Sequence, residues 1–420
     1  MAFLLMASSG LYAGITLEEC IALAQENYPL IRKYDLLDQT KEVNLSEINK
    51  SWLPQISLYG QGSVQNQTPS LPESLAGIIS QSGTSIRGID EWQYKIGAEI
   101  SQKIWDGGTS KTGRQIEHAE DAERQAALDV QLYAIRERVE NLYFGILLVD
   151  AQARQIRNML ALLQGNLDNL RTMYENGTAM QSDIEMVEAQ YLSTVQQLTQ
   201  AESMSKSYRK LLEIFTGKSL EGQELEKPDA SIPQDLMPAR PELRHFETQM
   251  LANEARNASI IANTVPKIGV FAQAYYGYPG LDYFQGMTNR NPTFNILAGV
   301  KVSWNIGAFY TKKNDRRKLG LASDDIAVQR DIFLFNTNMQ TRSQLDHINE
   351  LKAIMKENDR IVELRTSVRK AAESQLENGV IDAVGLLTKL TDEKKARLTA
   401  SYHEIQLLQS IYKLKYTLNK

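Results

Sequence analysis

The chain has 420 residues, of which 42% are hydrophobic and 23% are charged, so its length suits about two ordinary domains or one long assembly. Its net charge of −5 and its dispersed lysines and arginines provide no basic surface, which argues against nucleic acid as a partner. The single cysteine, Cys20, excludes an internal disulfide framework and cannot by itself form a zinc site.

Residues 1–14 combine a short apolar run with small residues at its end, which is typical of a remnant signal peptide and predicts export. The positive charges that usually open such a peptide are missing. No later segment reaches the run of about 20 apolar residues that a membrane-spanning helix needs. If the protein crosses a bilayer, it must do so with strands.

Helical patterns occupy most of the chain. Residues 16–51 predict two helices with a joint at Asn27 and Pro29. From Gly108 to Glu175 there is no proline, and apolar residues recur at alternating spacings of three and four, which predicts a coiled-coil seam on the order of 100 Å long. A turn at Asn176 and Gly177 then reverses the chain into another helix.

Four short segments carry the alternating pattern of strands instead, at about 53–65, 93–104, 266–278 and 293–304. In each, apolar or small residues alternate with polar ones, although Phe271 and Tyr275 blur the third segment. A length of about 11 residues spans a bilayer when the strand is tilted. A soluble sheet with one dry face and one wet face has the same pattern, so a single strand does not decide between the two.

The chain also repeats itself. The sequence around Pro29 recurs around Pro241, the turn after Trp105 recurs after Trp304, and the segment 175–177 recurs at 377–379. We therefore predict a tandem duplication. The first repeat is 15–216 with a helical hairpin at 108–216, the linker is 217–240, and the second repeat is 241–420 with a hairpin at 307–420.

Two features favour a membrane position for the strands. Aromatic residues lie toward the strand ends, as at a lipid interface, and the long helical rods leave no element to cover the strands. A sheet in hydrocarbon must close, because open edges leave backbone groups unpaired. Four strands are too few to enclose a lumen, whereas a dimer supplies eight strands and a trimer twelve.

Three groups of residues resemble a known family. They are Thr16-Leu17-Glu18-Glu19 with Ala22, Ala24, Asn27, Pro29 and Leu30; Trp105-Asp106-Gly107-Gly108; and the two Asn-Gly turns. Together they resemble the TolC-like outer-membrane efflux protein family over nearly all of the chain after residue 15.

This resemblance implies an α+β membrane protein that forms a homotrimer in the outer membrane of a Gram-negative bacterium. A shared 12-stranded β-barrel would lie in the lipid, with a long coiled-coil α-helical barrel in the periplasm. It implies a passive exit duct for a tripartite efflux or secretion system, partnered by a periplasmic membrane-fusion adaptor and an inner-membrane transporter.

The resemblance also assigns roles to residues. The adaptor-docking tip would consist of Asn176, Gly177, Thr178, Asn378, Gly379, Val380, Val384, Gly385 and Leu386. The strand–helix turns are Trp105, Asp106, Gly107 and Gly108 in the first repeat and Trp304 with Gly307 in the second. Asp183 and Asp382 are the gate candidates, but the family's basic and acidic gate residues are replaced in the second repeat by Ile381, Gly385 and Thr388, and a lone Asp after a turn is also a common helix cap.

Enzyme chemistry has no support in the sequence. The four histidines are isolated on charged stretches, and there is no phosphate-binding glycine loop or nucleophile elbow, so we expect neither a metal nor a cofactor. The main alternative to a duct is a trimeric coiled-coil scaffold with a soluble β head, which would not conduct ions.

Overall fold

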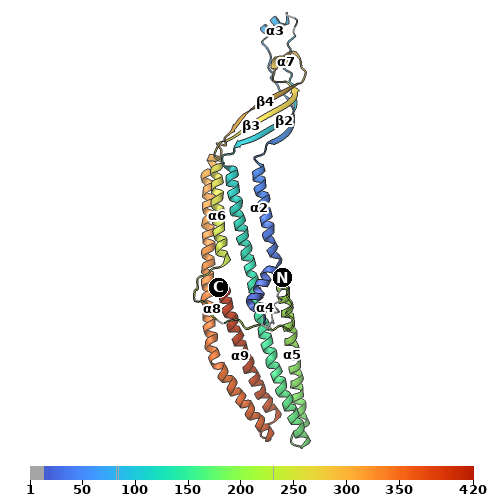
Figure 1. Cartoon of the computed structure of the whole chain (residues 1–420), viewed down its shortest axis with the longest axis vertical. Helices are drawn as coiled ribbons and strands as arrows, with labels where there is room; N and C mark the ends of the chain where they lie inside the picture. Colours follow the sequence, from blue (N-terminus) through green and yellow to red (C-terminus); the bar gives the residue numbers. More distant parts are fainter. Residues whose placement is uncertain (1–13, 82, 84, 230) are drawn as a thin grey trace, which may run out of the picture. The chain divides into compact units, whose positions relative to one another are not determined.

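The computed structural model describes residues 14–420 except 82, 84 and 230 (Figure 1). The predicted signal-peptide remnant lies, apart from Gly14, outside the described residues. Apart from two short helices, the helices and strands follow one another in the order that the sequence predicts. They are α1 (Leu17–Asn27), a 3-10 turn (Pro29–Ile31), α2 (Arg32–Lys50), β1 (Gln55–Val64), α3 (Glu73–Ser80), β2 (Trp92–Trp105), α4 (Thr109–Glu175), α5 (Gln181–Thr216), α6 (Pro241–Ala262), β3 (Lys267–Tyr278), α7 (Tyr283–Thr288), β4 (Thr293–Ser303), α8 (Ala308–Glu377) and α9 (Ala383–Leu418).

Two short helices were not predicted from the sequence. Helix α3 lies in the connection between β1 and β2, and α7 lies in the connection between β3 and β4. The sequence indicated only long loops at both places. Helix α7 begins where the Asp282 carboxylate accepts the backbone N–H of Gln285 at 3.0 Å. The connections pack on each other through a small cluster of Ile89, Tyr278 and Met287.

The chain divides into two compact units. One contains the chain up to Asp35, Gln125–Phe246 and Ala327–Lys420, and the other contains Leu36–Arg124 and Glu247–Ile326. We call them the helical unit and the sheet unit. Each unit takes segments from both sequence repeats.

The sheet unit is built around one antiparallel sheet of four strands in the order β1-β2-β3-β4 (Figure 1). Its register is continuous along β1 and β2, from Gln55 opposite Ser101 to Val64 opposite Trp92. A bulge between Lys103 and Trp105 interrupts the β2–β3 pairing next to the start of α4. The strands β1 and β4 form the two edges of this sheet.

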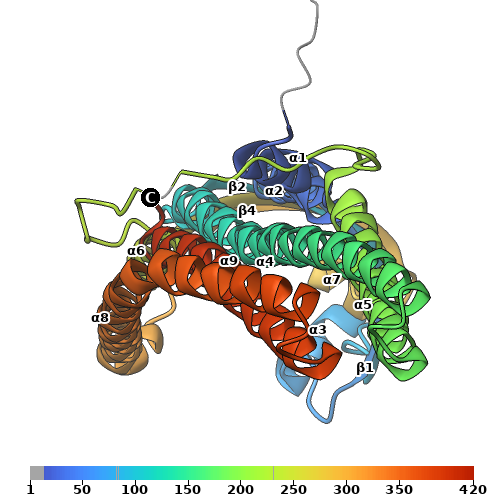
Figure 2. The same cartoon turned by 90° about the horizontal axis from the view of Figure 1, so that it is seen from below.

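The helical unit is built from two helical hairpins. Helices α4 and α5 form one, α8 and α9 form the other, and Figure 2 shows them side by side. All four helices contribute to one apolar cluster near the two turns, as the 3,4 spacing of the sequence requires. This cluster consists of Met159, Leu163, Leu167, Leu170, Ile184, Val187, Ala372, Leu376, Ala383, Leu386 and Leu390.

The start of the chain is tied to the linker between repeats. Ile15 forms a parallel bridge with Leu225, and the Tyr143 hydroxyl lies 2.8 Å from the Ile15 carbonyl oxygen and 2.7 Å from that of Glu226. Cys20 is fully buried on α1, and burial raises the pKa of its thiol to about 12. This cysteine is therefore a packing residue that stays protonated at neutral pH.

The end of the linker is held by an aromatic cage. The Arg240 guanidinium lies 5.2 to 5.5 Å from the ring centroids of Tyr133, Phe333 and Tyr416, and it also pairs with Glu242. Because the three rings belong to α4, α8 and α9, this cation fixes the linker against both hairpins of the helical unit.

Candidate functional site

One face of the sheet consists almost wholly of apolar side chains. The register places Leu58 opposite Ala98, Ala98 opposite Ala274, and all three on the same face. Leu58 is 84% exposed, Ile56 70% and Val300 67%, so the chain itself leaves this face uncovered. A contiguous apolar surface of this kind is rare in soluble monomers and marks contact with lipid or a partner. The exposed members are Ile56, Leu58, Val64, Trp92, Tyr94, Ile96, Ile100, Ile104, Val270, Tyr276, Phe294, Ile296, Val300 and Val302.

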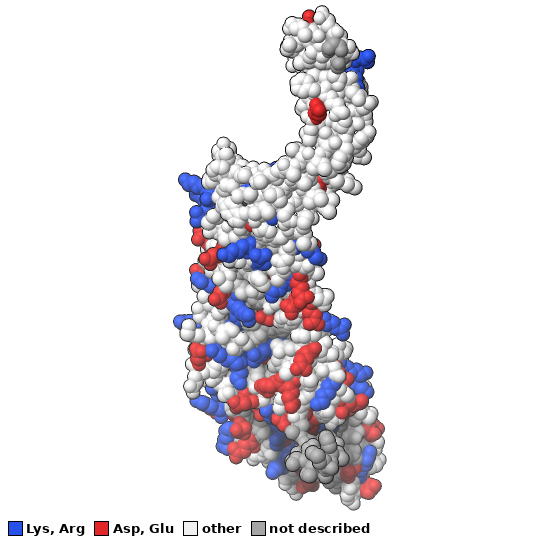
Figure 3. All heavy atoms as spheres, turned by 45° about the horizontal axis from the view of Figure 1, so that its top comes forward, with Lys and Arg blue, Asp and Glu red and all other residues white. Residues whose placement is uncertain are grey.

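Aromatic residues frame the apolar face at both ends of the strands. Tyr276 stands opposite Phe294, and Trp92 begins β2 at the same end. At the other end, Trp304 follows β4 and is 53% exposed. The predicted position of aromatics toward the strand ends therefore holds in the structure. Figure 3 shows few charged side chains over the strands on the face in view, in contrast to the helices.

None of the helices in the described part of the chain, residues 14–420 without 82, 84 and 230, is both long enough and apolar enough to span a bilayer.

The opposite face of the sheet is polar. Ser57, Glu99 and Gln273 share one row of the register, and the Gln273 amide donates to the Glu99 carboxylate at 2.6 Å. The predicted alternation is confirmed, because the register gathers the apolar positions of all four strands on one face. Phe271 and Tyr275, which blurred the sequence pattern, lie on the polar face; the Phe271 ring is beside Gly299, and Tyr275 stands opposite Gly97.

The first strand–helix turn is a compact cap. The Asp106 carboxylate, only 6% exposed, accepts the N–H groups of Gly108 at 2.9 Å and Ser110 at 2.7 Å. Burial alone would raise the pKa of Asp106, but these hydrogen bonds outweigh it and hold the pKa below its usual value. Gly107 and Gly108 have φ of +68° and +86°, angles at which other residues are strained.

The second strand–helix turn is held by a different contact. Gly307 does not adopt a positive φ, so its role is not the conformational freedom that the first turn requires. The turn is instead held by Trp304, whose indole N–H donates to the Thr264 carbonyl oxygen at 3.0 Å. The repeats therefore share the position of the turn but not its cap.

The two hairpin tips are closely similar. At the first, the N–H of Gly177 donates to the Tyr174 carbonyl oxygen at 2.9 Å, and at the second the N–H of Gly379 donates to that of Leu376 at 2.9 Å. Both glycines have a positive φ, as expected for a helix C-cap. The predicted tip residues Asn176, Gly177, Thr178, Asn378, Gly379 and Val380 are exposed.

Leu386 requires a correction. It was grouped with the docking residues, but it is 0% exposed and belongs to the four-helix apolar cluster. It supports the tip from within and offers no surface to a partner. Val384, at 48% exposure, and the half-buried Gly385 stand on the outer side of the same turn.

Both gate candidates act as helix caps. The Asp183 carboxylate accepts the Met180 N–H at 3.0 Å, and the Asp382 carboxylate accepts the Gly385 N–H at 2.9 Å. Each negative charge lies at the positive end of a helix dipole, α5 for Asp183 and α9 for Asp382. Both lie within the helical unit beside the tip turns.

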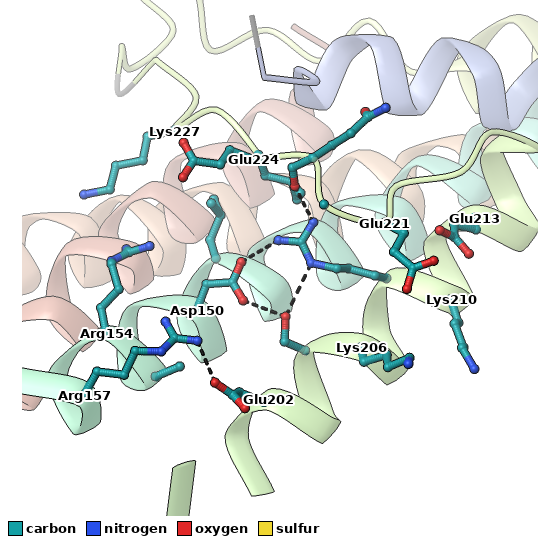
Figure 4. Close-up of a pocket in the computed structure, with 17 residues that line it drawn as sticks. Asp150, Arg154, Arg157, Glu202, Lys206, Lys210, Glu213, Glu221, Glu224 and Lys227 are labelled. Atoms are coloured by element: carbon teal, nitrogen blue, oxygen red, sulfur yellow. Dashed lines mark hydrogen bonds and ion pairs between the residues drawn. The ribbon is translucent and has the colours of Figure 1, made fainter. Parts of the chain in front are cut away.

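A charged cavity of about 580 Å³ lies between α4, α5 and the linker (Figure 4). The Arg209 guanidinium donates to Asp150 at 2.7 Å and to the Gln223 carbonyl oxygen at 2.6 Å, while Ser205 donates to Asp150 at 2.6 Å. Sequence reasoning missed this cluster, because its members are separated along the chain and show no motif. Arg209 clamps the linker to the first hairpin, which is a structural role.

Among the described residues, there is no group of three or more histidine, cysteine, aspartate or glutamate side chains that could hold a metal ion.

Comparisons with known proteins agree with this architecture. Residues 21–214 match the model of a family described as outer membrane efflux protein. The structure is similar to that of the outer membrane protein VceC of Vibrio cholerae, with 12% identity and a TM-score of 0.67, covering 96% of this chain and 95% of that one. It is also similar to the MtrE outer membrane channel of Neisseria gonorrhoeae, with 16% identity and a TM-score of 0.63, covering 96% of this chain and 88% of that one. The comparison with curated proteins found no match.

The fold is thus that of the TolC-like channels, with long helical hairpins attached to a four-stranded sheet. Residues 21–214, slightly less than half of the chain, also match the outer membrane efflux protein family model, so this part of the chain is similar to that family in sequence as well.

Proposed function

We propose that three copies of the chain form an exit duct through the outer membrane, as part of a tripartite efflux or secretion system. The observation that carries this proposal is the exposed apolar face of the sheet, framed by aromatics and backed by a polar face. Lipid on the apolar side and water on the polar side satisfy both faces. The duct is passive, because the family match and the fold point to a conduit and the energy comes from a pump in the inner membrane.

The sheet topology supports closure by identical copies. Strands β1 and β4 are edges, and the antiparallel order makes them run in opposite directions. A β4 edge therefore continues the antiparallel pattern when it pairs with β1 of another copy. Since unpaired edges are not tolerated in hydrocarbon, the sheets close into one barrel, and three copies supply twelve strands.

Ion conductance tests this function. We expect the purified protein to require detergent and to form ion-conducting pores in planar lipid bilayers. The trimeric scaffold with a soluble β head would leave the bilayer sealed and remain dispersed without detergent. That result would contradict the proposed duct and favour the trimeric scaffold.

We further propose that the two hairpin tips dock a periplasmic adaptor, with the helical unit lying in the periplasm. The tips support this because their outermost side chains are exposed and small, so that partner helices can approach closely. Asp183 and Asp382 remain the gate candidates: each lies near the start of the helix that follows a tip turn, and neither is buried.

Site-directed crosslinking checks the tip. Thr178→Cys and Val380→Cys place reactive thiols on exposed tip positions, so each should crosslink to an adaptor in intact cells. Leu386→Cys is the matched control, because this position is in the same tip but fully buried. The native Cys20 is buried with a raised pKa, so it does not compete for the reagent. Equal labelling of all three variants, or crosslinks from neither exposed position, would refute docking at the tips.

A further inference from the structure

The charged residues of the four strands all lie on the polar face. They are Lys95, Glu99 and Lys103 on β2, Lys267 on β3 and Lys301 on β4. The register confirms their common side, since Glu99 is opposite Gln273, and Lys103 and Lys301 are both opposite Gly269. Four lysines against one glutamate give this face a net charge of +3 per chain, although the chain as a whole is acidic.

These charges are not neutralised within the sheet. Among the described residues, none of the four lysines has a carboxylate oxygen within the 4.0 Å of an ion pair. Glu99 is engaged by the Gln273 amide rather than by a lysine. The positive charges of this face can therefore interact with ions or solutes in front of it.

Lys95 is the most firmly held of the four lysines. Its Nζ atom lies 5.8 Å from the centroid of the Tyr59 ring and 5.7 Å from that of Tyr275. The two tyrosines stand on either side of Gly97 in one row of the sheet, so no side chain separates them. The cation is thus supported from two sides by ring faces while its charge remains unpaired.

We infer that the bore enclosed by these strands attracts anions, and that the duct favours anionic solutes over cationic ones. The inference rests on the proposed function, because it requires the polar face to line the water-filled side of a closed barrel. With three copies the lining carries nine net positive charges on a wall backed by lipid. A low-dielectric wall of one sign concentrates counter-ions in the bore, and rings of lysine characterise anion pores.

Selectivity in planar bilayers tests this inference. The reversal potential of the wild-type pore is measured across a potassium chloride gradient and compared with that of a variant carrying Lys95→Gln, Lys103→Gln, Lys267→Gln and Lys301→Gln. We expect the ratio of chloride to potassium permeability to fall by at least about twofold in the variant. Glu99→Gln should move the ratio in the opposite direction, and Lys95→Arg, which keeps the charge, should leave it near that of the wild type.

The outcomes separate the two proposals. A wild-type protein that does not conduct overturns the duct and, with it, the anion preference. A conducting pore whose reversal potential is the same in the wild type, the four-lysine variant and Glu99→Gln overturns only the anion preference. If the four-lysine variant does not insert, the single variants Lys95→Gln and Lys103→Gln carry the test, each with a smaller shift in the same direction.

Discussion

Leu58→Lys should prevent the protein from entering a membrane while leaving its helical unit folded. Leu58 lies in the middle of β1 on the apolar face and is 84% exposed. On the surface of a soluble protein, a change at such a position alters stability by about 0.5 kcal/mol or less. On the lipid face of a barrel, a lysine near the bilayer midplane costs about 2–4 kcal/mol, and three copies of the chain introduce it three times.

The matched control is Ser57→Lys, the adjacent residue on the polar face. We expect Ser57→Lys to fold into lipid vesicles with a yield close to that of the wild type. Recovery of protease-resistant protein from vesicles measures both variants under the same conditions. Equal yields for the two lysines would contradict the assignment of lipid to the apolar face. A reversed order would place lipid on the other side of the sheet.

Much of the architecture was accessible from local sequence patterns. The break at Asn27 and Pro29 coincides with the end of α1 and the 3-10 turn, and the proline-free segment became the single helix α4. The strands appeared close to their predicted bounds, because alternation depends only on which face each side chain occupies. The Asn-Gly tips were predictable as well, since Gly177 and Gly379 occupy backbone angles that glycine tolerates best.

Other features depend on contacts between distant residues, and no local pattern reports them. The burial of Leu386 follows from packing of four helices, whereas its position after a turn suggested exposure. Gly307 follows a tryptophan in the second repeat as Gly107 does in the first, but the Trp304 indole ties its turn to the Thr264 carbonyl oxygen, whereas the Asp106 carboxylate accepts the Gly108 N–H at the start of α4. The short helices α3 and α7 are too brief to show a helical period.

Glu393→Gln should lower the free energy of unfolding by about 3 kcal/mol, the lower end of the range for breaking a buried ion pair from one side. Glu393 is 3% exposed on α9. It pairs with Arg369 of α8 and with Arg397 at 2.8 Å, and it accepts the Thr366 hydroxyl at 2.8 Å. Hydrogen bonds and charge from these partners hold the pKa of Glu393 below its usual value even though burial opposes this. Glutamine keeps the size of the side chain but leaves the two guanidinium groups without this counter-charge.

Asp392→Asn is the matched control. Asp392 directly precedes Glu393 on α9 and likewise pairs with an arginine of α8, Arg365, at 2.9 Å. Its side chain is 37% exposed and that of Arg365 48%, so its loss should cost less than about 1 kcal/mol. Thermal unfolding in detergent, followed by far-ultraviolet circular dichroism, compares the two. A larger effect is expected from Glu393 because its loss leaves Arg369 and Arg397 without a buried counter-charge, whereas the Asp392–Arg365 pair is exposed to water. Equal destabilisation by the two substitutions would contradict the larger contribution assigned to the buried Glu393, because burial would then add nothing to the worth of the ion pair.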